Sequence, residues 1–249
     1  MNMSSSQPIN VQLNQTPSCC AINASTSSAV FGYPDGSVCL YQRSGETFSP
    51  TMPMNIESVP ICLSLAEDAI IVGTSADVKI LPFGGEITPL EMDKPVTTLT
   101  HSCKQVFFGT CDGKVGCFSR ESVKNITSIP ILFGSVVSLS YSNNHLYALG
   151  SDGICYDITL EDGALEVQHQ FETKSNSTPF CIGSNASFIA VTSEDGTCFV
   201  WDCVSKQKIG ELKVAMYSKV AVTNCSELLF VSADESSVYV FSEGSFIKQ

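Results

Sequence analysis

The residues best suited to chemistry are twelve cysteines and three histidines. A zinc site needs paired Cys or His ligands at short spacing. The pairs Cys111/Cys117 and Cys198/Cys203 have neither a C-x-x-C spacing nor a histidine at ligand distance. A free thiol packs as a small apolar group, so the cysteines predict core positions. We expect no metal and no cofactor.

The histidines also give no support to a nucleophilic enzyme. His101, His145 and His169 fall in different sequence contexts, whereas a Ser–His–Asp or Cys–His site needs a positioned base beside its nucleophile. The sequence contains no G-x-S-x-G nucleophile elbow and no phosphate-binding P-loop. We therefore expect a protein without enzymatic activity.

Aspartates recur along the chain at spacings of 35 to 43 residues: Asp35, Asp77, Asp112, Asp152, Asp195 and Asp234. Carboxylates from several repeats could converge on a divalent cation, as in a metal-dependent hydrolase. Each aspartate, however, stands at an Asp-Gly or equivalent turn, where Asp hydrogen-bonds the local backbone. The spacing therefore favours a structural role, with the hydrolase as an alternative.

The aspartates mark a repeated hairpin that is clearest in residues 187–203, SFIAVTSEDGTCFVWDC. Two β-prone runs flank an Asp-Gly turn, and Trp201 closes the second run. Tyr41, Phe83 and Phe118 also stand six residues after their turn aspartates. Phe241 stands one residue later, and Tyr156 departs by standing only four residues after Asp152. Small residues end the strand before the turn and should let neighbouring sheets approach closely: Gly32, Gly73, Gly109, Gly150 and Ser232. A repeat of this length without helical periodicity predicts stacked four-stranded sheets.

These repeats resemble WD-repeat β-propeller blades, most clearly in Thr192–Asp202 with its terminal Trp201-Asp202 pair. The resemblance covers roughly residues 15–245. It implies an all-β fold, a single β-propeller of about six, or seven, four-stranded blades. The six turn aspartates and Trp201 would then be structural residues of turns and blades. Only one repeat has the Trp-Asp pair, and the Gly-His pair that often opens a family repeat is absent.

The N-terminal segment is expected to complete this fold. Residues 9–14, INVQLN, form a β-prone run before the first repeat. We expect this run to close the ring by pairing with the C-terminal blade, because closure removes exposed sheet edges. The alternative is an ordered tail on the surface. Residues 1–8 are rich in Ser and Asn and are predicted to be disordered, and residues 1–249 are expected to form one domain.

Charge and composition exclude several classes of partner. The formal net charge is −12, from 13 Lys+Arg against 25 Asp+Glu. Direct nucleic-acid binding needs clustered basic residues, so we do not expect it, and an acidic surface suits a basic peptide. The N-terminus has no secretory signal pattern, and no apolar run reaches the roughly 20 residues of a membrane span. We expect no membrane insertion, reduced cysteines, and a location in the cytoplasm, the nucleus or both.

These observations favour a non-enzymatic scaffold or adaptor, a monomeric subunit of a hetero-complex that binds proteins or peptides. Loops on the face that the family uses for ligands would supply the contacts: Tyr33, Pro34, Lys94, Phe133 and Glu194. A narrower resemblance to the Bub/Rae type of propeller, in VQLNQ and FVWDCVSKQKIGEL, implies a role in the mitotic checkpoint or mRNA export. The alternative is a coat or nuclear-pore subunit whose ring is completed by a partner's blade.

Overall fold

The computed structural model describes residues 13, 15–23, 25–45, 47–51, 53–121, 123, 126–131, 134–223, 227–232, 236–242 and 245–248. Within these residues the chain forms 25 β-strands and no helix. The chain divides into two compact units, Met1–Met92 and Asp93–Gln249. We call them unit 1 and unit 2, and we number the sheets from 1 to 6 in chain order.

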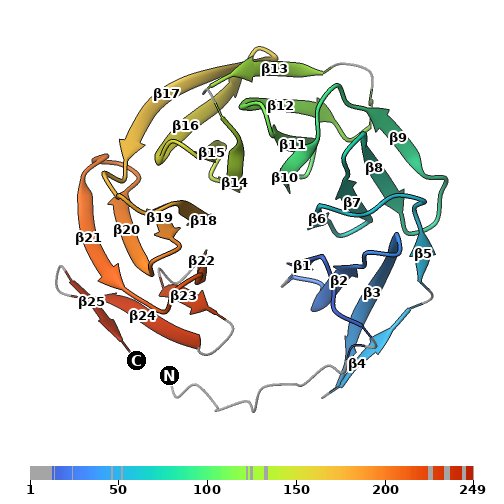
Figure 1. The fold of residues 1–249 in the computed structure, drawn as a ribbon, viewed down its shortest axis with the longest axis horizontal. Helices are drawn as coiled ribbons and strands as arrows, with labels where there is room; N and C mark the ends of the chain where they lie inside the picture. The colour runs from blue at the N-terminus through green and yellow to red at the C-terminus, as the bar shows by residue number, and fades with distance from the viewer. Residues whose placement is uncertain are drawn as a thin grey trace. The chain divides into compact units, whose positions relative to one another are not determined.

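Unit 1 contains sheets 1 and 2, which are blue to blue-green in Figure 1. Sheet 1 has the order β1 (Cys19–Asn23), β2 (Ser28–Gly32), β3 (Ser37–Ser44), β4 (Thr47–Pro50), and β5 (Met54–Asn55) also pairs with β3. Two short strands therefore share the outer position, β4 beside residues 41–44 and β5 beside residues 37–38. Sheet 2 has the order β6 (Cys62–Leu65), β7 (Ala69–Gly73), β8 (Asp77–Pro82), β9 (Thr88–Glu91).

Unit 2 contains four further antiparallel sheets. Sheet 3 has the order β10 (Val96–His101), β11 (Gln105–Thr110), β12 (Lys114–Ser119), β13 (Thr127–Pro130). Sheet 4 has the order β14 (Val136–Ser142), β15 (His145–Gly150), β16 (Ile154–Glu161), β17 (Ala164–Glu172). Sheet 5 has the order β18 (Pro179–Ser184), β19 (Phe188–Ser193), β20 (Thr197–Asp202), β21 (Lys208–Lys213). Sheet 6 has the order β22 (Lys219–Val222), β23 (Glu227–Val231), β24 (Ser236–Ser242), β25 (Ser245–Lys248).

Consecutive strands pair in every sheet, which is the blade pattern of a β-propeller. The predicted all-β propeller class is confirmed, with six blades among the described residues. The second and third strands are the most buried: β7, β11 and β15 each have five consecutive buried residues and β19 has six, while β12, β16 and β20 each have four. Successive side chains of a strand point to opposite faces, so a neighbouring sheet must cover each face.

The turn between the second and third strands follows one design in four sheets. Gly36, Gly113, Gly153 and Gly196 have φ between +80° and +86°, which glycine adopts without strain. The preceding aspartates occupy the turn, and Asp35 and Asp195 accept a hydrogen bond from the backbone N–H two residues on, at 2.9 Å. Asp234 lies outside the described residues.

Sheet 2 departs from this design and corrects the predicted alignment. Asp77 is the first residue of β8 instead of a turn residue, and its Oδ1 accepts the Thr74 hydroxyl at 2.6 Å. The turn has no glycine, and the pair that flanks it, Gly73 and Val78, is five residues apart, whereas the equivalent pair in sheet 3, Gly109 and Val115, is six residues apart. The third strand of sheet 2 therefore already includes its aspartate. Phe83 therefore lies beyond β8 and is 46% exposed, while Leu81 takes the buried position.

The same correction applies to the aromatic positions of sheets 4 and 6. Trp201 pairs with Ile189, and the equivalent pairs are Ile158 with Leu146 and Tyr239 with Leu228. Ile158 and Tyr239 thus replace Tyr156 and Phe241 at this position. In sheet 4 the turn has the same length as in sheet 5, and the residue six after Asp152 is simply not aromatic. In sheet 6 the first pair across the turn, Val231 and Ser236, is five residues apart instead of six, which shifts the register by one.

The predicted closing strand falls mostly outside the described residues. Leu13 is its one described residue; it is not part of a strand, and it packs against the sheet 1 cluster of Tyr33, Cys39 and Tyr41. Sheet 6 has four strands of its own from β22 to β25. Closure by residues 9–14 and the disorder of residues 1–8 stay predictions.

Neighbouring sheets approach closely at the small residues that end the second strands. A Cβ atom added to Gly109 would lie 2.6 Å from the Val136 side chain of sheet 4 and 2.8 Å from Thr98. Non-bonded carbon atoms pack at about 3.5–4.0 Å, so no side chain fits there. The distance between sheets 3 and 4 therefore depends on glycine at this position.

Replacing Gly109 by Ala should lower the free energy of unfolding by about 1–3 kcal/mol, the usual cost of overpacking. Urea unfolding followed by circular dichroism measures the change. Gly84→Ala is the control, because an added Cβ meets nothing within 4 Å there and the expected change is within about 0.5 kcal/mol. Equal midpoints for the two variants would contradict the close-packing argument.

Candidate functional site

The predicted partner-binding residues differ in exposure. Pro34 and Lys94 are exposed and Glu194 is half-buried, whereas Tyr33 is only 5% exposed. Burial and a hydrogen bond to Tyr41 raise the pKa of Tyr33 well above its usual value, as for a packed phenol. Phe133 lies outside the described residues. Burial leaves Tyr33 little side chain with which to contact a partner.

The four described residues come from different loops of the two units. Tyr33 and Pro34 are sequence neighbours in the β2–β3 turn of unit 1. Lys94 precedes β10 and Glu194 follows β19, in different loops of unit 2. Of the four described residues, Glu194 is the one that lies beside an exposed aromatic side chain.

Glu194 lies beside an exposed aromatic loop that the sequence analysis missed. Its carbonyl accepts the Tyr217 N–H at 3.0 Å, and the Tyr217 ring meets the Phe180 ring edge-on at 5.8 Å. Tyr217 is 53% exposed and Met216 is 60% exposed. We call Phe180, Glu194, Met216 and Tyr217 the loop patch. The sequence signal that could have predicted this patch is the apolar pair Met216–Tyr217 in the loop after β21.

The loop that carries this patch is well held. The Val214 N–H donates to the Gly196 carbonyl at 2.9 Å, and the Ser218 hydroxyl donates to the Ala215 carbonyl at 2.6 Å. Tyr217 has φ of 55°, a left-handed conformation that an apolar residue rarely adopts. An exposed aromatic side chain fixed in this way loses little entropy when a partner covers it.

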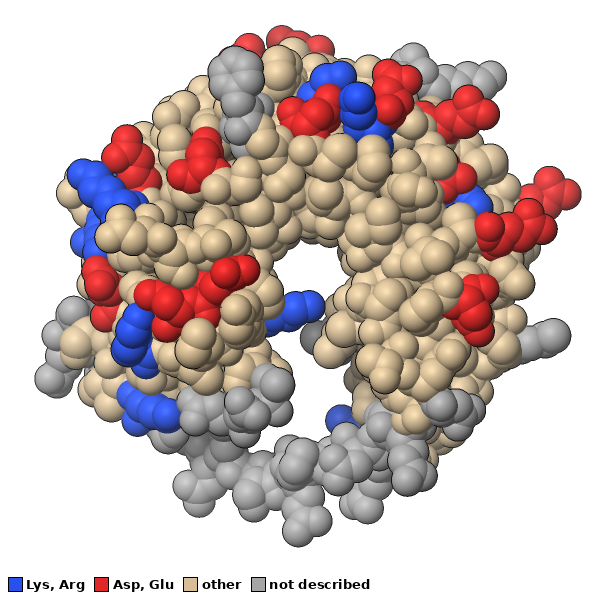
Figure 2. All heavy atoms as spheres, in the orientation of Figure 1, with Lys and Arg blue, Asp and Glu red and all other residues tan. Residues whose placement is uncertain are grey.

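The charge beside the patch is acidic. The Thr197 backbone N–H holds the pKa of Asp195 below its usual value, so this exposed carboxylate stays ionised at neutral pH. Lys213 Nζ lies 3.1 Å from Asp195 Oδ2 and offsets part of this charge. Acidic side chains are spread over the face drawn in Figure 2, and its described residues form no large continuous basic area.

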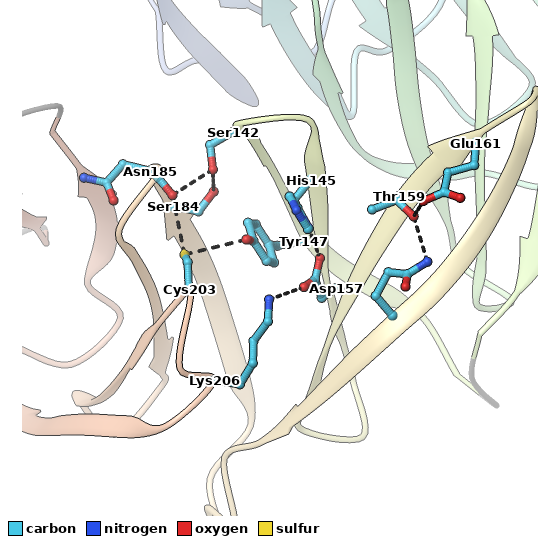
Figure 3. Close-up of polar contacts among 11 residues, drawn as sticks. Ser142, His145, Tyr147, Asp157, Thr159, Glu161, Ser184, Asn185, Cys203 and Lys206 are labelled. Atoms are coloured by element: carbon cyan, nitrogen blue, oxygen red, sulfur yellow. Dashed lines mark hydrogen bonds and ion pairs between the residues drawn. The ribbon is translucent and has the colours of Figure 1, made fainter.

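A second polar cluster lies between sheets 4 and 5 (Figure 3). Asp157, in β16, is fully buried. His145 Nδ1 lies 2.6 Å from its Oδ1, and Lys206 Nζ lies 2.7 Å from its Oδ2. We call these three residues the inter-sheet ion cluster. Lys206 comes from the β20–β21 turn, so the cluster joins sheet 5 to sheet 4.

Comparison with the other sheets shows how unusual Asp157 is. It pairs with Tyr147, and the equivalent third-strand positions are occupied by buried, apolar residues: Leu40, Ile80, Cys117 and Val200. A carboxylate at such a position is costly to desolvate unless cations and hydrogen bonds satisfy it. Here each of its oxygens has one such partner.

Local backbone structure delivers both partners. Asn143 and Asn144 have positive φ, and their tight turn places His145 at the start of β15, where its ring stacks 6.0 Å from Tyr147. Lys206 also has positive φ, at 59°. Asp202 Oδ1 fixes the Lys206 turn by accepting the Val204 and Ser205 N–H groups at 3.0 and 2.7 Å.

The chemistry of this cluster is limited. His145 hydrogen-bonded to Asp157 resembles the base of a catalytic triad, but a triad also needs an activated nucleophile. Cys203 lies nearby, where its Sγ accepts the Tyr147 hydroxyl at 3.6 Å and contacts the Asn185 carbonyl at 3.6 Å. Burial raises the pKa of Cys203, which keeps the thiol protonated and weakly nucleophilic. The arrangement is that of a structural link between sheets.

The described residues contain no group of three His, Cys, Asp or Glu side chains that could hold a metal ion. Their eleven cysteines are free thiols, and four of these are buried: Cys39, Cys117, Cys155 and Cys198. No described segment is a helix long and apolar enough to cross a membrane.

No known protein-family model matches the chain. The solved structure of RRP9 WD40 repeats matches with a TM-score of 0.79 and 13% identity, covering 96% of this chain and 81% of that chain. U3-55K matches with a TM-score of 0.77 and 13% identity, covering 94% and 80%. The computationally designed Ika8 protein matches with a TM-score of 0.73 and 16% identity, covering 91% and 72%. The fold is therefore a WD40-like β-propeller.

Replacing Lys206 by Met should lower the free energy of unfolding by about 2–3 kcal/mol, because Asp157 would stay buried with His145 alone. Lys208→Met is the matched control in the same hairpin. Lys208 pairs with Glu211 at the surface, where ion pairs contribute less than about 1 kcal/mol, and it lies 4.6 Å over the Phe199 ring, which a Met side chain can still contact. Chemical unfolding measures both changes, and equal losses would contradict a special role for the buried carboxylate.

The double variant Asp157→Leu/Lys206→Met should recover most of the stability lost in Lys206→Met. Leu40 occupies the equivalent position in sheet 1, and a buried ion pair can often be exchanged for apolar residues at little cost. The same unfolding measurement tests this. A double variant less stable than Lys206→Met would show that the position cannot accept an apolar side chain.

Proposed function

We propose that the protein is a non-enzymatic interaction scaffold or adaptor, a monomeric subunit of a hetero-complex that binds a protein or peptide through the loop patch. The observation that carries this proposal is the exposed Met216–Tyr217 pair, held by Phe180 and by the Glu194 carbonyl. Aromatic residues and Met are enriched at protein interfaces, and rigid aromatic residues form many hot spots. Pro34 and Lys94, both exposed, remain candidate contacts.

The chemistry of the partner follows from charge. Glu194 and the ionised Asp195 lie beside the aromatic patch, and the whole chain has a net charge of −12. We expect a basic peptide segment that covers Tyr217 and places Lys or Arg near these acids. Direct nucleic-acid binding and membrane insertion are not part of the proposal. A site of action in the cytoplasm or nucleus rests on the absence of a secretory signal pattern and on the expected reduced cysteines. A role in the mitotic checkpoint or mRNA export rests on the sequence resemblance alone.

Affinity purification of the full chain with mass spectrometry tests this function. Tyr217→Asn with Met216→Ser removes the apolar contacts, and Asn tolerates the left-handed backbone of position 217. Partners that need the patch should be recovered at least about tenfold less, as expected for loss of a hot spot. Val204→Ser is the control, since Val204 is 86% exposed in the β20–β21 turn, at the other end of the strands.

The loss must be reproduced with the purified partner by a direct binding measurement. Equal affinity of the wild type and the double variant for every stable partner would contradict the loop patch as the binding surface. Absence of any stable partner would contradict the scaffold function itself.

A further inference from the structure

A pocket of about 290 Å³ opens between sheets 3 and 4. Five of the eight lining residues are apolar: Phe107, Leu146, Ile158, Leu160 and Leu165. Polar atoms nevertheless form most of the surface that the pocket presents. Gln105, Tyr141 and Asn144 complete the lining and are more exposed than the deepest wall residues. The pocket lies near the start of β15, at the opposite end of the strands from the loop patch. The pocket is therefore separate from the loop patch and from the function proposed for that patch.

The space between sheets 3 and 4 has a smaller third-strand side chain than the equivalent space between sheets 4 and 5. Ile158 pairs with Leu146 as Trp201 pairs with Ile189, so Ile158 and Trp201 are equivalent positions. Between sheets 4 and 5 the large Trp201 side chain packs against Tyr147 and Phe171. Between sheets 3 and 4 the smaller Ile158 stands in its place and packs against Phe107.

The polar residues differ in the same way. Gln105 is the counterpart of His145, and Cys117 is the counterpart of Asp157. The β16–β17 turn consists of Asp162 and Gly163, so it has no residue that could reach inward as Lys206 does from the longer β20–β21 turn. The counterpart of Ser184 is the larger Tyr141, whose ring fills part of this space, and the remainder is the pocket.

The chemistry of the lining selects an uncharged, planar group. The lining contains no Asp, Glu, Lys, Arg or His, so a buried ligand charge would have no partner. The Phe107 and Tyr141 rings stack with centroids 4.9 Å apart and 21° between their planes. At the mouth, Asn144 Oδ1 accepts the Tyr141 hydroxyl at 3.3 Å, and Gln105 Oε1 accepts the Ser102 hydroxyl at 3.4 Å. Carboxamide oxygens have two lone pairs each, which leaves room for a further donor.

We propose that this pocket binds the indole side chain of a tryptophan supplied by a partner protein. The incoming ring takes the place that Trp201 fills between sheets 4 and 5, and its N–H donates to the Asn144 carboxamide oxygen, with Gln105 beside it at the mouth. The volume lies at the lower limit for ligand pockets, which suits one side chain better than a cofactor. Burial of an aromatic ring supplies the affinity, and the Asn144 carboxamide supplies the preference for an N–H donor.

The test is a titration of the full chain with N-acetyltryptophan amide, followed by methyl NMR of labelled Leu and Ile residues. We expect saturable shifts at Leu160 and Leu165 and none at Leu63, a buried residue of β6 in unit 1. N-acetylleucine amide should bind at least about threefold more weakly, because it lacks the ring and the N–H donor. Absence of shifts at Leu160 and Leu165 up to the solubility limit, or equal binding of the leucine amide, would overturn the proposal.

Two variants locate the binding. Ile158→Trp fills the pocket in cis and should abolish the shifts. Asn144→Gly keeps the backbone with φ of 63° but removes one carboxamide, and should weaken binding about three- to tenfold. Asn143→Gly is the matched control, because Asn143 also has positive φ but does not line the pocket, and its affinity should be unchanged.

If Ile158→Trp does not fold, the affinities of Asn144→Gly and Asn143→Gly for N-acetyltryptophan amide test the proposal. Weaker binding in Asn144→Gly alone supports the site. Equal affinity of both variants and the wild type overturns it.

Discussion

The burial of the second and third strands of each sheet is the constraint on which the rest of the structure depends. In β20, Cys198 and Val200 pack toward sheet 6, while Phe199 and Trp201 pack toward sheet 4. A sheet in isolation would expose one of these apolar faces to water, and each large side chain buried stabilises the fold by about 1.5–3 kcal/mol. Neighbouring sheets within a unit therefore stabilise one another. Their spacing depends on positions such as Gly109, where only a hydrogen atom fits.

Against this constraint, Asp157 is the most informative exception. The other third strands place an apolar residue at its position, and a lone carboxylate there would destabilise the fold. Two unrelated turns compensate for it, one bringing His145 and the other bringing Lys206. Each turn has residues with positive φ, so backbone strain is accepted in order to satisfy the charge. Such a cluster favours one particular sheet as the neighbour of sheet 4, which apolar packing alone would specify less sharply.

Much of the fold could be predicted from the sequence because the repeat is long and regular. The six sheets follow from the period of the aspartates, and four of the turns follow from Asp-Gly. Phe83 was misplaced because the turn before Asp77 has no glycine and is shorter. The sequence predicts Tyr33 as an aromatic residue of a surface loop, but Tyr33 is buried. Its burial depends on contacts with Cys39 and Tyr41 that only the folded sheet creates.

The candidate site was harder to predict than the fold. Met216 and Tyr217 are apolar, and an apolar pair in a sequence cannot be told from a short strand by composition. Their exposure comes from the hydrogen bonds of the loop after β21. The unusual sequence of β16, with Asp157 among apolar residues, was visible as a departure from the repeat, but its partners come from two other segments.

The role of Trp201, the single tryptophan, becomes clear when it is compared with Ile158, the equivalent residue of sheet 4. Trp201 packs between two sheets and is 4% exposed, so it fills space and contacts no external partner. Where the repeat has Ile158 instead, the same region retains a pocket of about 290 Å³. A cavity in a packed interior costs stability. A pocket open at a polar mouth costs less, because water or a ligand can occupy it. The residue at one third-strand position, Trp201 in sheet 5 and Ile158 in sheet 4, therefore determines whether the space between two sheets is filled by the protein's own side chain or is open to a ligand.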